Sequence, residues 1–137
     1  MSPFQDLLAG NERFAATFAL GGLSPRAARG VAILTCIDSR IPPLEVFELV
    51  PGDAKILRNA GARVTEDMIR TLAIATSQLG VTRIAVMRHT DCAAGNDNDA
   101  QGLHEDLQRL RDDPRIPDDV ELIGLRYDVE TGRVAQL

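Results

Sequence analysis

The chain has 137 residues, enough for one domain with a modest core, so a single domain over residues 1–137 is predicted. Its apolar stretches run to about five or six residues, far short of the ~20 that a membrane span needs. The formal charge is −5, with acids crowded into residues 97–119, and this argues against nucleic acid, whose phosphates need a basic face. The N-terminus carries Asp6 and no basic cluster, so we predict no secretory signal and a cytoplasmic protein.

The apolar pattern predicts helices and strands in alternation. The clearest helix covers residues 65–79: Thr65 can cap its start, two acids follow in the first turn, and Gly80 ends it. In chain order the predicted elements are a helix over 4–18, a strand over 31–35, a helix over 42–50, a strand over 54–58, the helix over 65–79, a strand over 81–87, a loop over 93–102, a helix over 103–111 and a strand over 121–129, followed by a turn and a short tail.

This alternation predicts an α/β fold: a doubly wound, mostly parallel central sheet of four to five strands flanked by helices. In such folds, ligands bind beyond the carboxyl ends of the strands, where the strand order reverses. If the second strand lies on one side of the first and the third on the other, that crevice falls between the first and third strands.

Two short motifs stand just after those two strands. Cys36-Ile-Asp-Ser-Arg40 follows the first, and His89-Thr-Asp-Cys92 follows the third. They hold both cysteines of the chain and one of its two histidines. Thiolate, imidazole and carboxylate are the ligands that zinc prefers, so Cys36, Asp38, His89 and Cys92 are the candidate metal ligands for Zn²⁺.

Asp38 has more than one possible role. Alternate residues of an extended segment share a face, so Cys36, Asp38 and Arg40 should project together. Three protein ligands plus water are typical of catalytic zinc, whereas four protein ligands are typical of structural zinc. Asp38 could therefore orient a catalytic water or take the fourth ligand position, and Arg40 could hold it away from the metal. Asp38 and Arg40 are the candidate catalytic residues.

These motifs, with Arg58-Asn59-Ala60-Gly61 between them, resemble the β-class carbonic anhydrases in order and rough spacing. The stretches 7–14, 61–80 and 124–132 also resemble the family's N-terminal helix, the helix before the third strand and the closing strand. The resemblance covers most of the chain.

The resemblance implies zinc on Cys36, His89 and Cys92, with an Asp38–Arg40 dyad near the fourth position. It implies an enzyme, a zinc lyase that hydrates CO2 to bicarbonate by zinc-bound hydroxide. It also implies a homodimer or dimer of dimers, since family members complete their pockets across the subunit interface. The expected partner is a small-molecule substrate, with no nucleic acid and no membrane.

Three departures from the family leave alternatives open. Ala93 follows Cys92 where the family usually has glycine, Ala27 stands where many members have a glutamine, and the segment between Cys92 and the last strand is shorter than expected. Hydrolysis of COS or CS2 on the same site, or an inactive zinc-binding module closed by Asp38, therefore remain possible. A dithiol redox site is disfavoured because the cysteines are not in a Cys-x-x-Cys arrangement.

The remaining polar residues are predicted to be structural. His104 is expected on the surface of an acidic helix, with a proton shuttle or an interface group as the less favoured role. Asp91 is expected to bond its own loop. Asn59 and Gly61 are expected to shape the loop over the site. The acidic stretch 97–119 is predicted to be a solvated face, because it lacks the spaced ligands of a calcium loop.

Overall fold

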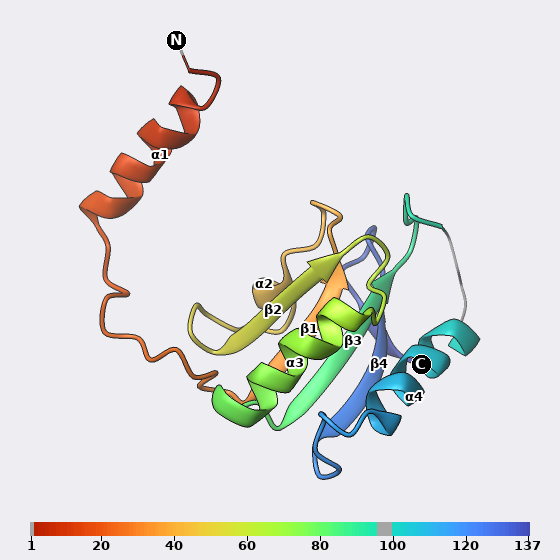
Figure 1. Ribbon diagram of the computed structural model, residues 1–137. Helices are drawn as coiled ribbons and strands as arrows, with labels where there is room; N and C mark the ends of the chain where they lie inside the picture. The colour runs from red at the N-terminus through yellow and green to blue at the C-terminus, as the bar shows by residue number, and fades with distance from the viewer. Residues whose placement is uncertain (1, 96–99) are drawn as a thin grey trace.

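The computed structural model describes residues 2–95 and 100–137. Its centre is a five-stranded sheet in the order β2-β1-β3-β4-β5, in which β1 to β4 are parallel and β5 runs antiparallel to β4 (Figure 1). The strands are β1 (Val31–Cys36), β2 (Ala54–Asn59), β3 (Arg83–His89), β4 (Glu121–Tyr127) and β5 (Val134–Gln136). The predicted mostly parallel α/β sheet is confirmed, and β2 and β3 lie on opposite sides of β1, the condition under which the crevice falls between β1 and β3.

Four helices accompany the sheet within the described residues. They are α1 (Gln5–Ala16), α2 (Pro43–Val46), α3 (Glu66–Gln78) and α4 (Ala100–Asp112). Helices α3 and α4 lie on one face of the sheet, and α2 lies on the other (Figure 1). None of these helices is both long enough and apolar enough to cross a membrane.

Successive side chains of a strand point to opposite faces of the sheet, so the hydrophobic core is divided into two layers. Ala32, Leu34 and Val86 belong to the layer shared with α3 and α4. Ile33 and Met87 belong to the layer on the opposite face, packed with residues of the α2 segment. Because both faces are covered along the inner strands, these strands are apolar almost throughout, as buried parallel strands usually are.

Helix α3 forms as predicted. The Thr65 side chain accepts a hydrogen bond from the Met68 N–H at 3.3 Å, which caps the first turn. Gly80 follows the helix with φ of +77°, a conformation that favours glycine. The residues buried from this helix are Ile69, Leu72 and Ala75.

Two predicted boundaries are wrong by several residues. The helix expected over 42–50 ends at Val46, because Glu48 adopts a left-handed conformation with φ of +55° and the Leu49 N–H bonds back to the Leu44 carbonyl. The loop expected over 93–102 is partly helical, since α4 already includes Ala100. Residues 96–99 of that predicted loop lie outside the described part of the chain.

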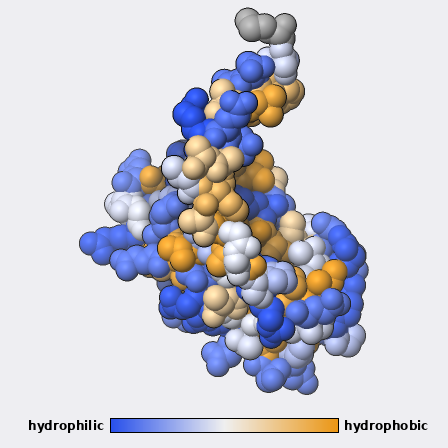
Figure 2. All heavy atoms as spheres, turned by 90° about the vertical axis from the view of Figure 1, so that its left-hand side faces the viewer, coloured by the Kyte–Doolittle hydropathy of each residue, from blue (hydrophilic) through white to orange (hydrophobic). Residues whose placement is uncertain are grey.

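Helix α1 stands apart from the sheet. It projects from the body at the end of an extended segment (Figure 1), and none of its residues is buried. Its apolar side chains gather on the projecting helix in the space-filling view (Figure 2). The large apolar side chains of α1 and of the residues next to it are more than half exposed; they are Phe4, Leu7, Leu8, Phe14 and Phe18.

Candidate metal centre

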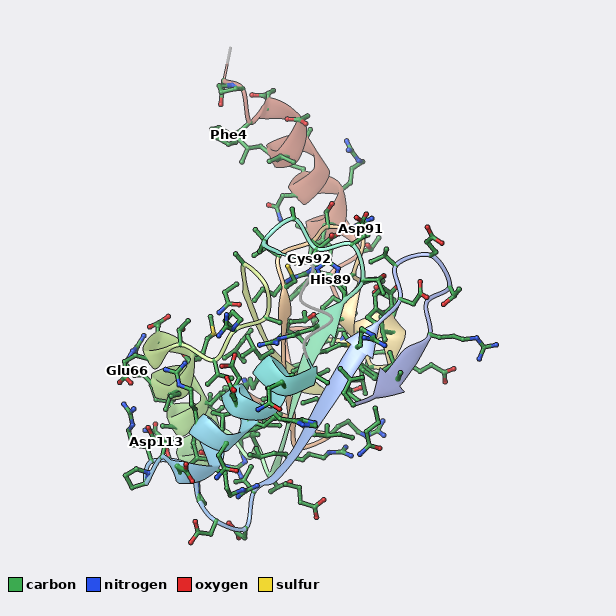
Figure 3. All side chains as sticks on the ribbon, turned by 90° about the vertical axis from the view of Figure 1, so that its right-hand side faces the viewer. Phe4, Glu66, His89, Asp91, Cys92 and Asp113 are labelled. Atoms are coloured by element: carbon green, nitrogen blue, oxygen red, sulfur yellow. The ribbon has the colours of Figure 1, made fainter. Side chains whose placement is uncertain are left out.

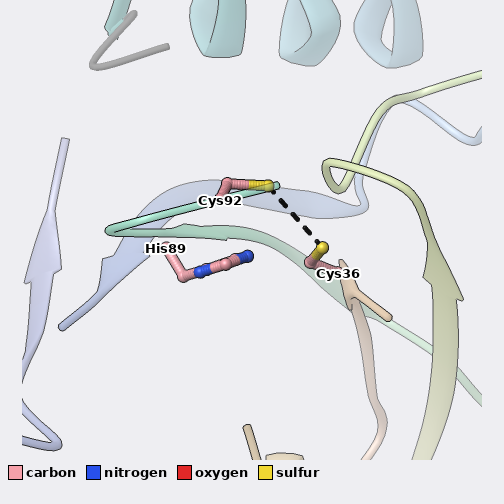
Figure 4. Close-up of side chains that lie close together, drawn as sticks. All are labelled: Cys36, His89 and Cys92. Atoms are coloured by element: carbon pink, nitrogen blue, oxygen red, sulfur yellow. Dashed lines mark hydrogen bonds between the residues drawn. The ribbon is translucent and has the colours of Figure 1, made fainter. Parts of the chain in front are cut away.

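The register of the parallel strands places two motif residues side by side. Thr35 pairs with Met87, so Cys36 at the end of β1 and His89 at the end of β3 lie at the same edge of the sheet. Cys92 follows in the turn after β3, and Figure 3 shows it with His89 at this end of the sheet, away from Glu66 and Asp113. The ligand atoms of Cys36, His89 and Cys92 all lie within 4.8 Å of one another, and the two Sγ atoms are 3.8 Å apart (Figure 4).

The His89 imidazole is held in one tautomer. Its side chain is 1% exposed, and Nδ1 lies 2.6 Å from the Thr90 carbonyl oxygen. A carbonyl can only accept, so the hydrogen is assigned to Nδ1. Nε2 then carries the lone pair, and it is buried without a hydrogen-bond partner among the described residues. A bound metal would satisfy this atom.

The Cys36 thiol is set up to ionise easily. Burial alone would raise its pKa, but the Gly61 N–H lies 3.4 Å from Sγ and donates to it. Hydrogen bonds from the backbone at Asp38 and from Cys92 act in the same direction, and the pKa of Cys36 is lowered from 9.0 to about 7. The thiolate is the form that binds metals. Burial raises the pKa of Cys92, so the two thiols are not equivalent.

This donor set fits zinc. Two sulfur atoms and one imidazole nitrogen are a common set of three zinc ligands, and such a set leaves a fourth position for water or substrate. The unpartnered Nε2 of His89 is the observation that most directly fits an ion at this place. Both cysteines are free thiols in the structure, as metal ligands must be.

The Asp38 carboxylate lies beside this cluster and is held by Arg40. The Arg40 Nε is 3.0 Å from Oδ1 and Nη2 is 2.6 Å from Oδ2, while the Arg40 backbone N–H donates to Oδ1 at 2.9 Å. These hydrogen bonds hold the pKa of Asp38 well below its ordinary value. Its Oδ2 is 3.9 Å from His89 Nδ1, so the carboxylate borders the candidate site with both oxygens engaged by Arg40.

Asp91 has a role that sequence reasoning missed. It is expected from the sequence to bond its own loop, but it accepts hydrogen bonds from Arg40 through Oδ2 at 3.1 Å and through its carbonyl at 2.9 Å. The Arg40 guanidinium thus ties the turn of one motif to the carboxylate of the other. The sequence signal for this pairing is an acid and a base at matching strand ends. Asp91 lies in the motif after β3, and Arg40 lies in the motif after β1.

Arg58 is a second residue whose role the sequence did not reveal. From β2 its Nε donates to the Cys36 carbonyl and its Nη2 to the Asp38 carbonyl, both at 2.7 Å. The neighbouring Asn59 accepts from the Arg63 N–H and donates to the Arg63 carbonyl, which closes the loop after β2. Arg58 therefore fixes the backbone of the first motif.

Ala93, unlike Asp91, does not adopt positive φ, so its Cβ imposes no backbone strain there. Ala27 is buried, and its N–H donates to the Leu79 carbonyl. His104 is exposed, as expected. The prediction of a solvated acidic face over 97–119 is wrong at Asp106, which is 2% exposed, because its helix turns this carboxylate toward arginines of the sheet side.

Two hollows flank the cluster. A cavity of about 600 Å³ opens beside Cys36 and the Asp38–Arg40 pair and is otherwise lined by Ile37, Ser39, Ala60, Ala93 and Ala94. A smaller one of about 50 Å³ lies toward Arg63 and Arg88 and touches His89 and Cys92. Small molecules can therefore reach the cluster from the side that carries the Asp38–Arg40 pair.

Residues 31–113, which contain both motifs, match the family model described as carbonic anhydrase. Beta-carbonic anhydrase 1 of Mycobacterium tuberculosis (strain ATCC 25618 / H37Rv) is 28% identical over 162 aligned positions, covering 100% of this chain and 99% of that protein. The chain belongs to the β-class carbonic anhydrase family. Because the alignment is longer than the chain's 137 residues, the mycobacterial carbonic anhydrase has residues without a counterpart here.

Solved carbonic anhydrases share the fold. The enzyme from Streptococcus mutans superposes with a TM-score of 0.89 at 35% identity and covers 99% of this chain and 98% of its own. The one from Glaciozyma antarctica gives a TM-score of 0.84 at 31% identity, covering 99% of both chains. A carbon disulfide hydrolase of Saccharolobus solfataricus is 45% identical over 64 residues. The aligned segment covers 47% of the present chain and 31% of the hydrolase.

Proposed function

We propose that this protein is a zinc-dependent carbonic anhydrase that converts CO2 and water to bicarbonate and a proton. The observation that supports this best is the cluster of Cys36, His89 and Cys92, with its buried, unpartnered Nε2, beside the Asp38–Arg40 pair. Cys36, His89 and Cys92 would hold the ion. When bound, zinc supplies a Lewis acid that acidifies water and stabilises negative charge on a substrate oxygen.

The protein's own groups then have distinct parts. Asp38 is kept ionised by Arg40, so at neutral pH its carboxylate can accept a hydrogen bond and orient the attacking water. Arg40 fixes that carboxylate through three side-chain hydrogen bonds and is itself anchored by Asp91. With both oxygens so engaged, Asp38 is favoured as an orienting group over a fourth metal ligand.

Stopped-flow CO2 hydration on protein of measured zinc content tests this proposal. One zinc per chain, with activity that rises with pH, is expected. Asp38→Asn should keep the zinc and lose most of the activity, because the amide offers an N–H where the mechanism needs an acceptor. Asp91→Asn is the matched control and should lose less, since Asp91 acts on Asp38 through Arg40. A protein with full zinc and no activity at any pH would instead support the closed, inactive zinc module.

Hydrolysis of COS or CS2 at the same centre is the second candidate. Two observations favour it: the local identity to a carbon disulfide hydrolase, and the apolar side chains of Ile37, Ala60, Ala93 and Ala94 around the larger cavity. Sulfide release from COS and CS2 by the zinc-loaded protein distinguishes this function from CO2 hydration. Turnover of CS2 without turnover of CO2 would replace the first proposal by the second.

We also propose that the chain works as a homodimer or dimer of dimers. The apolar side chains of α1 stay exposed, although the Phe14 ring contacts that of Phe18, and a second copy could bury them (Figure 2). Tetrameric β-carbonic anhydrases of the same fold occur in Sordaria macrospora. Light scattering should give at least a dimer, and Leu8→Glu should weaken it while Glu12→Gln on the same helix should not. A monomer at all concentrations would contradict this.

The proposed zinc chemistry also bears on location and domain organisation. Cys36 and Cys92 must stay reduced to bind the ion, which suits a reducing compartment, and we propose the cytoplasm.

Residues 1–137 are proposed to act as one domain, because the candidate ligands and the residues that support them come from segments spread between β1 and α4.

A further inference from the structure

Asp106 is a buried carboxylate in the middle of α4. It lies between Leu103 and Leu110 on the buried side of the helix and is 2% exposed. Burying a charge is costly unless it is paired and hydrogen-bonded. Asp106 is well paired: Oδ2 accepts from the Arg63 Nε and the Val64 N–H, each at 2.9 Å, and from the Arg88 Nη2 at 3.1 Å.

The first two of these bonds reach the loop after β2. That loop is closed on itself by Asn59, whose side chain bonds both the N–H and the carbonyl of Arg63. Within it, Gly61 has φ of +84° and donates its N–H to Cys36 Sγ at 3.4 Å. Asp106 therefore fixes the far end of the loop that supplies the hydrogen bond to the Cys36 sulfur.

The third bond reaches β3. Arg88 is 8% exposed and directly precedes His89, so the Asp106 carboxylate is joined to the strand end that carries the imidazole. Arg63 and Arg88 also line the small cavity of about 50 Å³ that touches His89 and Cys92. One side chain of α4 is thus connected to both halves of the cluster.

We propose that Asp106 is a positioning residue of the metal centre: through Arg63 and Val64 it holds the Gly61 N–H on Cys36, and through Arg88 it fixes the end of β3 beside His89. This inference rests on the proposed zinc site. Groups that orient metal ligands from outside the coordination sphere commonly change metal affinity by about 10- to 100-fold when mutated, and Asp106, which acts through a loop, should lie at the lower end.

Zinc affinity, measured by competition with a chromogenic chelator, and the absorption spectrum of the Co²⁺-substituted protein test the proposal. Asp106→Asn should weaken zinc binding about 10-fold and alter the thiolate-to-cobalt bands. Leu110→Ala is the matched control, because it removes a buried side chain of the same helix that cannot hydrogen-bond the loop. It should lower the melting temperature while zinc affinity and the cobalt spectrum stay as in wild type.

Arg63→Gln provides a second variant that keeps the buried pair of Asp106 and Arg88. Arg63 is about half exposed, so this change should fold and should also weaken zinc binding and alter the cobalt bands. Wild-type affinity and spectrum in both Asp106→Asn and Arg63→Gln would overturn the positioning role and leave the proposed function intact. A wild-type protein that binds neither zinc nor cobalt would overturn the proposed function, and the positioning role with it.

Discussion

Replacing His89 with alanine should remove most of the stability that zinc adds to the folded protein. The ligand atoms of His89, Cys36 and Cys92 lie within 4.8 Å of one another, and His89 Nε2 is buried with no hydrogen-bond partner among the described residues. Without metal, the ring makes a 2.6 Å hydrogen bond to the Thr90 carbonyl, and its Nδ1 lies 3.9 Å from Asp38 Oδ2. The greater part of the imidazole's contribution should therefore appear only when an ion is bound.

The size of the effect follows from ligand linkage. At a free zinc concentration 100 times the dissociation constant, an ion that binds only the folded state adds about 2.7 kcal/mol to the free energy of unfolding. For 137 residues the unfolding entropy is about 0.29 kcal/mol/K, so zinc should raise the wild-type melting temperature by about 9 °C. If loss of one ligand weakens zinc binding about 100-fold, the same zinc adds about 0.4 kcal/mol, or about 1.5 °C.

Thermal unfolding of metal-free protein with and without added zinc measures this difference. His104→Ala is the matched control, because His104 is the chain's other histidine and is exposed on α4. It should keep the full zinc-dependent rise. The reasoning is refuted if zinc raises the melting temperature of His89→Ala as much as that of wild type, or if His104→Ala loses the rise.

Three further predictions concern other parts of the molecule. Arg40→Ala releases the Asp38 carboxylate, so CO2 hydration should fall and the cobalt spectrum should change; if neither moved, Arg40 would have no orienting role. Gly124→Ala places a Cβ within 2.9 Å of a leucine of α4 and should lower the free energy of unfolding in urea by about 1–3 kcal/mol, whereas Gly22→Ala, with nothing within 4 Å, should have little effect. Hydrogen bonds from Arg115 lower the pKa of Asp113 from 3.8 to about 2, so the stability that this carboxylate contributes is present above pH 3.8 and is lost as the pH falls toward 2. Acid unfolding of Asp113→Asn should lack this loss. An acid-unfolding profile identical to that of wild type would argue against the pairing.

Much of the site could be predicted because its signals are local. Cys36 and His89 each follow a short apolar run, and parallel strands bring their carboxyl ends to one edge of the sheet. The helix over 65–79 was equally readable, since Thr65 and Gly80 mark its two ends. In each case the information lies within a few residues along the chain, where spacing, capping and turn conformation act directly.

The sequence by itself therefore determined the α/β class and the residues that meet at the candidate metal centre, whereas the strand order came from the structure. Only the tertiary structure decided that Asp106 is buried among arginines, that Arg40 binds Asp91 as well as Asp38, and that α1 buries none of its residues against the described part of the chain. Asp106, Arg63 and Arg88 are far apart in sequence, and a charged residue on a helix is ordinarily solvated. The arginines that make the burial of this carboxylate favourable come from other parts of the fold, so no local sequence pattern could reveal that Asp106 is buried.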